Sequence, residues 1–241
     1  MRVLIISDIH ANLSALDSVL ADAKDRWDVL WCLGDLVGYG PKPNECVELV
    51  RTLDPVCLLG NHDWAALGRI DIEMFNNEAR EVVEWTQEQL EKETIDYLET
   101  LESKTVVDDY TLAHASPRYP IWEYVLDLKV AAANFDVLET PYCFIGQSHV
   151  PLLFEKADNS GVEWYLPSYA PTSINGTRMI INPGSVGQPR DNDPRASYVI
   201  LDTDEMTIEH RRVPYPIEVT QGQMREAGLP NRQIERLAQG W

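Results

Sequence analysis

The chain has 241 residues, of which 44% are hydrophobic and 24% charged, a composition that fits a folded protein with a sizeable core and excludes a disordered or fibrous chain. Its 39 acidic and 20 basic residues give a formal charge of −19, which disfavours a nucleic acid partner because such a surface repels a phosphate backbone. No apolar run approaches the ~20 residues needed to span a membrane, so we expect a cytoplasmic protein with no membrane partner.

The first sixty residues alternate between apolar runs and amphipathic segments. Asn12 can cap the first helix, and Pro43 suits the start of the second. The pattern predicts strand, helix, strand, helix, strand at 3–6, 13–24, 28–33, 43–52 and 56–59. This order indicates a parallel sheet with right-handed crossovers.

Residues 64–103 interrupt that order with a mostly helical pattern, which we interpret as a helical insertion beside the site. Its many glutamates fit a solvated helix face. From residue 152 short apolar runs separated by turn residues predict antiparallel strands. The further elements are expected at 106–114 (strand or hairpin), 127–138 (helix), 142–145, 152–154, 162–166, 179–181, 197–201 and 207–212 (strands), and 216–241 (C-terminal helical tail). Because no repeat or linker appears, we expect residues 1–241 to form one domain.

Metal-binding residue types follow five of the apolar runs. In open α/β sheets, functional groups gather beyond the carboxyl ends of the strands, so these side chains would meet at one edge. Carboxylates, an amide oxygen and imidazoles suit Mn, Fe, Zn or similar divalent ions, and there are enough donors for two. The alternative is a set of unrelated helix caps and core histidines. The residues concerned are Asp8, His10, Asp35, Asn61, His62, His114, Gln147 and His149.

The order and spacing of these motifs resemble those of the calcineurin-like metallophosphoesterases from Met1 to about Leu201. Residues 182–190 resemble a smaller bacterial and archaeal branch, which includes YfcE-type phosphodiesterases and proteins related to diadenosine tetraphosphatase. The resemblance implies an α/β fold, a four-layer α/β/β/α sandwich, with a dinuclear metal centre. The motifs are Asp8-Ile9-His10, Gly34-Asp35, Gly60-Asn61-His62-Asp63, His114 and Gly146-x-x-His149.

The resemblance also implies a role for each residue. One divalent ion (Mn, Fe, Zn, Ni or Mg) would be held by Asp8, His10, Asp35 and His149, and a second by Asp35, Asn61, His114 and Gln147. His62 would be a general acid that protonates the leaving oxygen, and Asp63 would orient His62 or a ligand histidine.

Gln147 departs from the family, which usually has histidine at this position. A neutral amide offers only its carbonyl oxygen. Direct ligation, ligation through a water and low occupancy are all compatible with this residue. Our hypothesis is that the second metal binds more weakly than the first.

A glycine-rich loop follows the run at 179–181. Gly184 and Ser185 could expose N–H groups to a phosphate, with Arg190 as a bidentate donor. Alternatively the loop is a tight turn in which Arg190 pairs with Asp191 or Asp193.

Some further polar and aromatic residues have no motif of their own. His210 is expected to be a solvated strand residue. Tyr39, Asn12, Arg118 and Trp122 could line the pocket, although aromatic residues near loops are more often packing residues.

Together these features predict a metal-dependent phosphohydrolase that cleaves a small phosphodiester or nucleotide with a metal-bridging hydroxide and a histidine general acid. The alternatives are a phosphomonoesterase, which could act on phosphoprotein, and a catalytically weak regulatory module that binds metal or nucleotide. The partner is expected to be a small phosphoester, since the negative charge disfavours polymers. The oligomeric state is not predicted.

Overall fold

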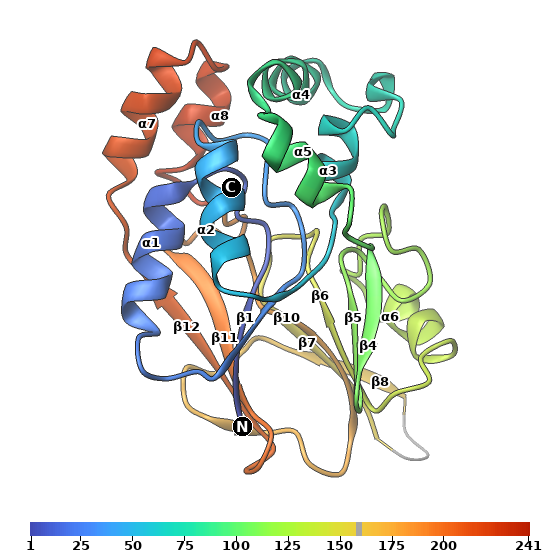
Figure 1. Cartoon of the computed structure of the whole chain (residues 1–241). Helices are drawn as coiled ribbons and strands as arrows, with labels where there is room; N and C mark the ends of the chain where they lie inside the picture. The colour runs from blue at the N-terminus through green and yellow to red at the C-terminus, as the bar shows by residue number, and fades with distance from the viewer. Residues whose placement is uncertain (158–160) are drawn as a thin grey trace.

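Two six-stranded mixed sheets lie face to face in the computed structural model, which describes residues 1–157 and 161–241 (Figure 1). The strands of the first sheet are, in spatial order, β3 (Val56–Cys57), β2 (Val29–Cys32), β1 (Arg2–Ile6), β11 (Ala196–Asp202), β12 (Thr207–Val213) and β9 (Thr172–Ser173). Those of the second are β4 (Lys104–Val107), β5 (Tyr110–Ala113), β6 (Tyr142–Ile145), β10 (Arg178–Asn182), β7 (Leu152–Lys156) and β8 (Val162–Tyr165).

Helices cover the outer faces of the two sheets (Figure 1). The helices are α1 (Leu13–Asp22), α2 (Pro43–Thr52), α3 (Asn61–Ala66), the 3₁₀ helix η1 (Ile72–Met74), α4 (Asn77–Gln89), α5 (Lys92–Leu98), α6 (Leu128–Phe135), α7 (Ile217–Glu226) and α8 (Asn231–Arg236). None of them, within the described part of the chain, is long and apolar enough to cross a membrane.

Strand β1 explains why the sandwich has these layers. Val3 and Ile5 belong to the core between the two sheets, whereas Leu4 and Ile6 belong to the core beneath α1 and α2. Side chains alternate along a strand, so a run of apolar residues can fill two cores at once. The α/β fold with two sheets flanked by helices is therefore as expected.

The strand directions agree with the expected parallel sheet at the N-terminal end of the chain. β1, β2 and β3 pair in parallel. Of the later strands, β7, β8, β11 and β12 pair antiparallel, but β10 also lies parallel to β6. Local apolar patterning cannot reveal that neighbour, because it does not encode which strand a segment will pair with.

The expectation that His210 is a solvated strand residue is wrong. His210 is 2% exposed in β12, and its Nε2 donates to the carbonyl oxygen of Asn182 in β10, 3.1 Å away. Its strand partner is Val199, whose side chain lies in the core between the sheets, so His210 points the same way. Burial lowers the pKa of His210 to about 4.

Three helices pack together above the sheet edge. Val82 of α4 shares an apolar cluster with Met224 of α7 and Ile234 of α8. Figure 1 shows these helices near the top, beyond the carboxyl ends of β1 and β2. The region expected to be helical and the C-terminal tail therefore cover the same end of the molecule.

Candidate metal centre

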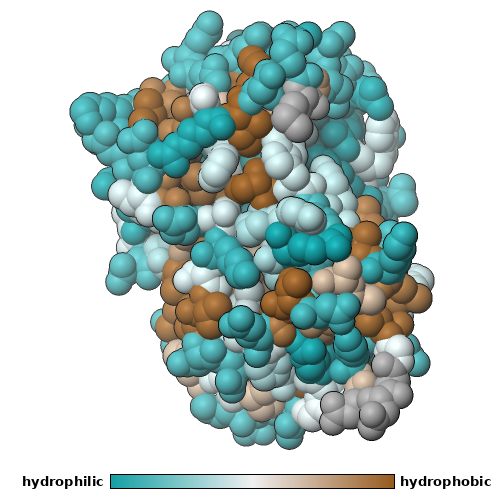
Figure 2. Space-filling view, turned by 90° about the vertical axis from the view of Figure 1, so that its right-hand side faces the viewer, coloured by the Kyte–Doolittle hydropathy of each residue, from teal (hydrophilic) through white to brown (hydrophobic). Residues whose placement is uncertain are grey.

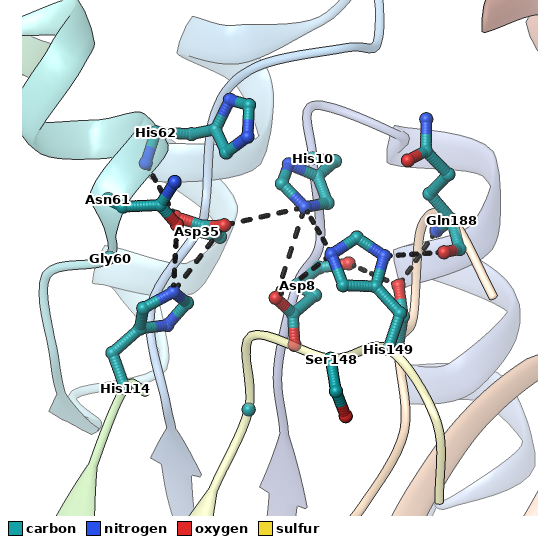
Figure 3. Close-up of polar contacts among 12 residues, drawn as sticks. Asp8, His10, Asp35, Gly60, Asn61, His62, His114, Ser148, His149 and Gln188 are labelled. Atoms are coloured by element: carbon teal, nitrogen blue, oxygen red, sulfur yellow. Dashed lines mark hydrogen bonds and ion pairs between the residues drawn. The ribbon is translucent and has the colours of Figure 1, made fainter. Parts of the chain in front are cut away.

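The predicted metal ligands all lie shortly after the carboxyl ends of strands (Figure 3). The first sheet supplies those after β1, β2 and β3, and the second sheet supplies those after β5 and β6. Because the sheets lie face to face, these strand ends meet at one edge of the sandwich. The residues are Asp8, His10, Asp35, Asn61, His114, Gln147 and His149.

The turns that carry these residues have unusual backbone geometry. Five non-glycine ligands adopt positive φ, a region that costs energy for most residues. Aspartate and histidine are among the residues that tolerate it best, whereas glutamine has no such advantage. The φ values are 53° for Asp8, 48° for His10, 54° for Asp35, 66° for Gln147 and 60° for His149.

Four ligand atoms form a compact group in which all lie within 4.8 Å of one another. Asp8 Oδ1 is 3.3 Å from His149 Nε2 and 3.9 Å from His10 Nε2. Asp35 Oδ2 is 3.5 Å from His10 Nε2. These four residues, all buried, are the set that the sequence motifs assign to one metal.

Backbone carbonyls fix the tautomers of the three ligand histidines. A carbonyl oxygen only accepts, so each Nδ1 must carry the proton and each Nε2 must present a lone pair to the site. The Nδ1–H groups donate to carbonyl oxygens as follows: His10 to Val37 at 3.1 Å, His114 to Leu33 at 2.8 Å and His149 to Gln188 at 2.6 Å.

This assignment gives the group two facing lone pairs. His10 Nε2 and His149 Nε2 lie 3.1 Å apart, yet neither has a hydrogen to donate to the other. In addition, both carboxylate oxygens of Asp8 are buried and have no hydrogen-bond partner among the residues that the structure describes. A cation between these atoms removes the repulsion and satisfies the carboxylate, so the residues fit a divalent metal.

A second group of acceptors lies on the other side of Asp35. His114 Nε2 is 3.5 Å from Asp35 Oδ2 and 3.2 Å from Asn61 Oδ1. Gln147 lies in the turn that also carries His149, and in the described part of the chain its buried Oε1 has no hydrogen-bond partner. An unsatisfied amide oxygen is what a ligand position requires, so Gln147 also fits a role as an oxygen donor.

Asp35 occupies the position between the two groups (Figure 3). Its Oδ2 is 3.5 Å from both His10 Nε2 and His114 Nε2, while its Oδ1 accepts from the backbone N–H of His62 at 2.9 Å. Gly60 permits this approach, because a Cβ there would lie 2.1 Å from Asp35 Oδ1. One carboxylate oxygen of Asp35 thus accepts a backbone hydrogen bond, and the other is available to both groups of candidate ligands.

Burial makes charge costly throughout this cluster. It raises the pKa of Asp8 to about 7 and that of Asp35 well above its usual range. It also lowers the pKa values of His10 and His149 well below the ordinary value. Neutral imidazoles are the form that ligates metal, and a cation would restore the ionised carboxylates.

His62 lies beside the metal ligands but faces other rings. Its ring centroid is 5.0 Å from that of His10, 4.4 Å from that of Tyr39 and 5.3 Å from that of Phe75. Its Nδ1 is buried, and no described residue forms a hydrogen bond with it. Burial, together with the nearby Arg190 and His114, lowers the pKa of His62 to about 3.

Asp63 acts on the site through the backbone. Its Oδ1 accepts from the N–H of Val37 at 3.0 Å and its Oδ2 from the N–H of Gly60 at 2.9 Å. Val37 is also the residue whose carbonyl holds the His10 ring. Of the two alternatives left by the sequence, these contacts favour orientation of a ligand histidine, His10, over orientation of His62.

The glycine-rich loop contacts the Asp8 turn. The N–H groups of Val186 and Gly187 donate to the carbonyl oxygens of Ser7 and Asp8, both at 3.0 Å. Ser185 is fully buried and its hydroxyl donates to the Asp8 carbonyl at 2.8 Å.

These groups, like the N–H of Gly184, which donates to Asn182 Oδ1 at 2.8 Å, are engaged within the fold. These contacts favour the tight-turn alternative over phosphate binding by Gly184 and Ser185.

Arg190 pairs with neither of the carboxylates that the tight-turn alternative assigns to it. Asp191 pairs instead with Arg212, and Asp193 with Arg195. Arg190 donates to Gln188 Oε1 at 2.9 Å, while its buried Nε has no hydrogen-bond partner within residues 1–157 and 161–241.

The Arg190 guanidinium also lies over the Tyr39 ring, 5.6 Å from its centroid. A guanidinium with free hydrogen-bonding capacity beside the ligand group suits an anion.

No sequence motif marks the carbonyl groups that orient the histidines. Leu33, Val37 and Gln188 contribute through the backbone, and any residue type supplies a carbonyl. Phe75 was also missed as a neighbour of His62, because no motif marks it.

Comparisons with known proteins agree with this geometry. A family model described as the calcineurin-like phosphoesterase superfamily domain matches residues 1–206. An uncharacterised protein of Methanocaldococcus jannaschii is 37% identical over 248 residues, covering 99% of this chain and 98% of its own. The crystal structure of a metallophosphoesterase from Sphaerobacter thermophilus is 49% identical with a TM-score of 0.91, covering 100% of this chain and 99% of its own.

A shorter likeness involves an enzyme with a named activity. The symmetrical bis(5'-nucleosyl)-tetraphosphatase of Psychromonas ingrahamii is 40% identical over 67 residues, which cover 26% of this chain and 24% of that protein. The family model and the two full-length relatives confirm the family expected from the motifs. The chain therefore belongs to the calcineurin-like phosphoesterase superfamily, a family of phosphoester hydrolases.

Proposed function

We propose that the protein hydrolyses a small phosphodiester or nucleotide with two divalent cations and His62 as general acid. The observation that carries this proposal is the position of Asp35 Oδ2, 3.5 Å from a ligand nitrogen on each side. A carboxylate so placed can belong to two metal sites at once. Asp8, His10 and His149 would complete one site, and Asn61, His114 and Gln147 the other.

The bound cations would polarise a phosphoryl oxygen and lower the pKa of the attacking water. Arg190 would bind a second phosphoryl oxygen, because its guanidinium has hydrogen-bonding capacity to spare. In the overall reaction the oxygen of water bonds to phosphorus, the bond from phosphorus to the leaving oxygen breaks, and that oxygen gains a proton.

His62 would donate that proton to the leaving oxygen and recover one from solvent. Its ring lies 5.0 Å from that of His10, close enough to reach a group bound beside the metal ligands. The negative charge of a bound phosphoester favours the protonated ring and so opposes the effect of Arg190 and the cations, which lower the pKa of the imidazole.

The charge of the molecule supports a small substrate. With a formal charge of −19 the surface repels a long polyanion, whereas cations reverse the sign only at the site. The likeness to a bis(5'-nucleosyl)-tetraphosphatase supports a nucleotide within this class.

The test compares an aryl phosphodiester with an aryl phosphomonoester after reconstitution with Mn, Fe, Co, Zn, Ni or Mg. We expect metal-dependent hydrolysis that a chelator abolishes, with kcat/KM higher for the diester. A higher value for the monoester would assign the protein as a phosphomonoesterase. Absence of hydrolysis with every metal would exclude the enzyme and leave a binding module.

A further inference from the structure

We propose that Phe75 and Trp122 form the binding surface for a nucleobase in the leaving part of the substrate. The inference rests on the proposed function, since it takes His62 to be the group beside the leaving oxygen. It adds the chemical class of the substrate: a phosphoester whose leaving part carries a planar aromatic ring.

A series of ring contacts leads from the site to this surface. The centroid of Phe75 is 5.3 Å from that of His62 and 5.6 Å from that of Trp122. A group that leaves beside His62 therefore meets aromatic side chains next. Aromatic faces bind nucleobases by stacking, whatever the base.

The side of the site beneath the C-terminal helices has no room for such a group. The hollow between His10, Tyr39 and Leu237 has a volume of about 10 Å³, enough for roughly one water molecule. By contrast, the open surface hollow lined by Trp122, Tyr119 and their neighbours has a volume of about 450 Å³, which leaves room for a nucleoside. A leaving group of nucleoside size fits only the second of these hollows.

The segment between β5 and α6 presents its apolar side chains to solvent. Figure 2 looks onto the side of the molecule that carries β4 and α6, where brown apolar side chains interrupt the hydrophilic surface. Singly exposed apolar residues need no explanation, but several from one segment indicate a binding surface. The exposed fractions are 59% for Tyr119, 37% for Trp122, 46% for Tyr124 and 51% for Leu126.

Hydrogen bonds fix this segment in place. The Glu123 carboxylate accepts from Ser116 Oγ and Asn134 Nδ2, both at 2.8 Å, and pairs with Arg118. Arg118 is therefore tied to Glu123, the residue next to Trp122. A surface held in this way loses little conformational entropy when a ligand binds.

Calorimetry of AMP and ribose 5-phosphate binding to the metal-loaded protein tests the proposal. Both carry the same phosphate on the same sugar, so the ratio of their Kd values measures the contribution of the base. We expect AMP to bind at least about 5-fold more tightly, the lower limit for one stacked base. Equal Kd values for the two ligands in the natural protein would overturn the proposal.

Variants show which side chains provide the contribution of the base to binding. Trp122→Ala and Phe75→Ala should each bring the ratio of Kd values towards one, whereas Trp122→Phe should keep most of it. Trp164→Ala is the matched control, because Trp164 is 52% exposed on the edge strand β8. A ratio that survives in both Trp122→Ala and Phe75→Ala would show that the base binds elsewhere.

The binding test of the base surface and the hydrolysis test of the proposed function can fail independently. If the protein hydrolyses no phosphoester but AMP still binds more tightly in a Trp122-dependent manner, the base surface stands and the hydrolase fails. If hydrolysis occurs and the two ligands bind equally, the hydrolase stands and the base surface fails.

Discussion

The Nε2 atoms of His10 and His149 lie 3.1 Å apart, although the Nδ1–H of each ring is already donated to a carbonyl oxygen. Two lone pairs at this distance repel each other, and the repulsion becomes attraction to a shared cation when metal binds. The free energy of unfolding of the protein should therefore rise when metal binds.

His149→Asn tests this relationship. Asparagine tolerates the positive φ of the position, so backbone strain should not be added. In chelator, the variant should unfold with a free energy within about 1 kcal/mol of the natural protein, because loss of the lone pair offsets loss of packing. With Mn²⁺ at about 100 times its Kd, the natural protein should gain about 2.7 kcal/mol. The variant should gain much less at the same Mn²⁺ concentration, because its affinity falls at least about 10-fold.

Urea unfolding with and without Mn²⁺ measures the free energy of unfolding in chelator and the gain that Mn²⁺ produces. An equal metal-induced gain in the variant would exclude His149 as a ligand.

The second metal site should be the weaker one. Gln147 offers a neutral oxygen where a histidine would offer a nitrogen, and it has a φ of 66° that glutamine rarely adopts. Titration by calorimetry should resolve two unequal affinities, which converge in Gln147→His. Equal affinities in the natural protein would contradict the hypothesis.

His62→Asn should separate chemistry from metal binding. Removing a general acid lowers turnover by about 10²–10⁴-fold, and the main-chain N–H that donates to Asp35 is retained. We expect kcat on an alkyl phosphodiester to fall by that factor while metal content by mass spectrometry is unchanged. Retention of full activity would remove His62 from the mechanism.

His210 should make the fold sensitive to acid. Its pKa is about 4 in the folded protein and about 6.5 when unfolded, so the unfolded chain binds an extra proton between these values. The stability is complete above about pH 6.5 and decreases as the pH falls through this window, with a loss of about 2 kcal/mol at pH 5.

His210→Gln keeps a donor for Asn182 but not the titration. The difference in unfolding free energy between pH 7.5 and pH 5, measured in urea with chelator present, should be about 2 kcal/mol smaller in this variant. Identical pH dependence in the two proteins would show that His210 does not contribute.

Two glycine substitutions should have opposite effects. A Cβ at Gly187 would lie 1.8 Å from the carbonyl oxygen of Ile9, whereas a Cβ at Gly222 in α7 meets nothing within 4 Å. Gly187→Ala should destabilise the protein by about 1–3 kcal/mol or more, because backbone cannot move aside cheaply. Gly222→Ala should stabilise it by up to about 1 kcal/mol. Thermal unfolding of the two variants provides the comparison, and a neutral Gly187→Ala would mean that the loop can shift away from the Asp8 turn.

The sequence predicted the elements whose signal is local. The run at 3–6 identified β1, and the polar residues directly after it identified the site edge, because functional groups in such sheets gather beyond the carboxyl ends of the strands. Motif order then supplied the set of candidate ligands. The features that the sequence did not predict depend on contacts between distant parts of the chain. They are the parallel partner of β10, the burial of His210 against Asn182, and the link from Asp63 to His10 through Val37. None of these contacts joins residues close enough in the chain for a periodic pattern to record them.

The ligands come from two sheets, with Asp8, His10 and Asp35 on the first and His114 and His149 on the second. Each of the two proposed cations would be held by residues of both sheets, and so would add a cross-link to the packing and hydrogen bonds between them. Like a disulfide, it would act on the cooperativity of the whole molecule and not on one loop. Depleting the metal would then loosen the interface between the sheets, and hydrogen exchange should accelerate first in the inner faces of β1 and β6.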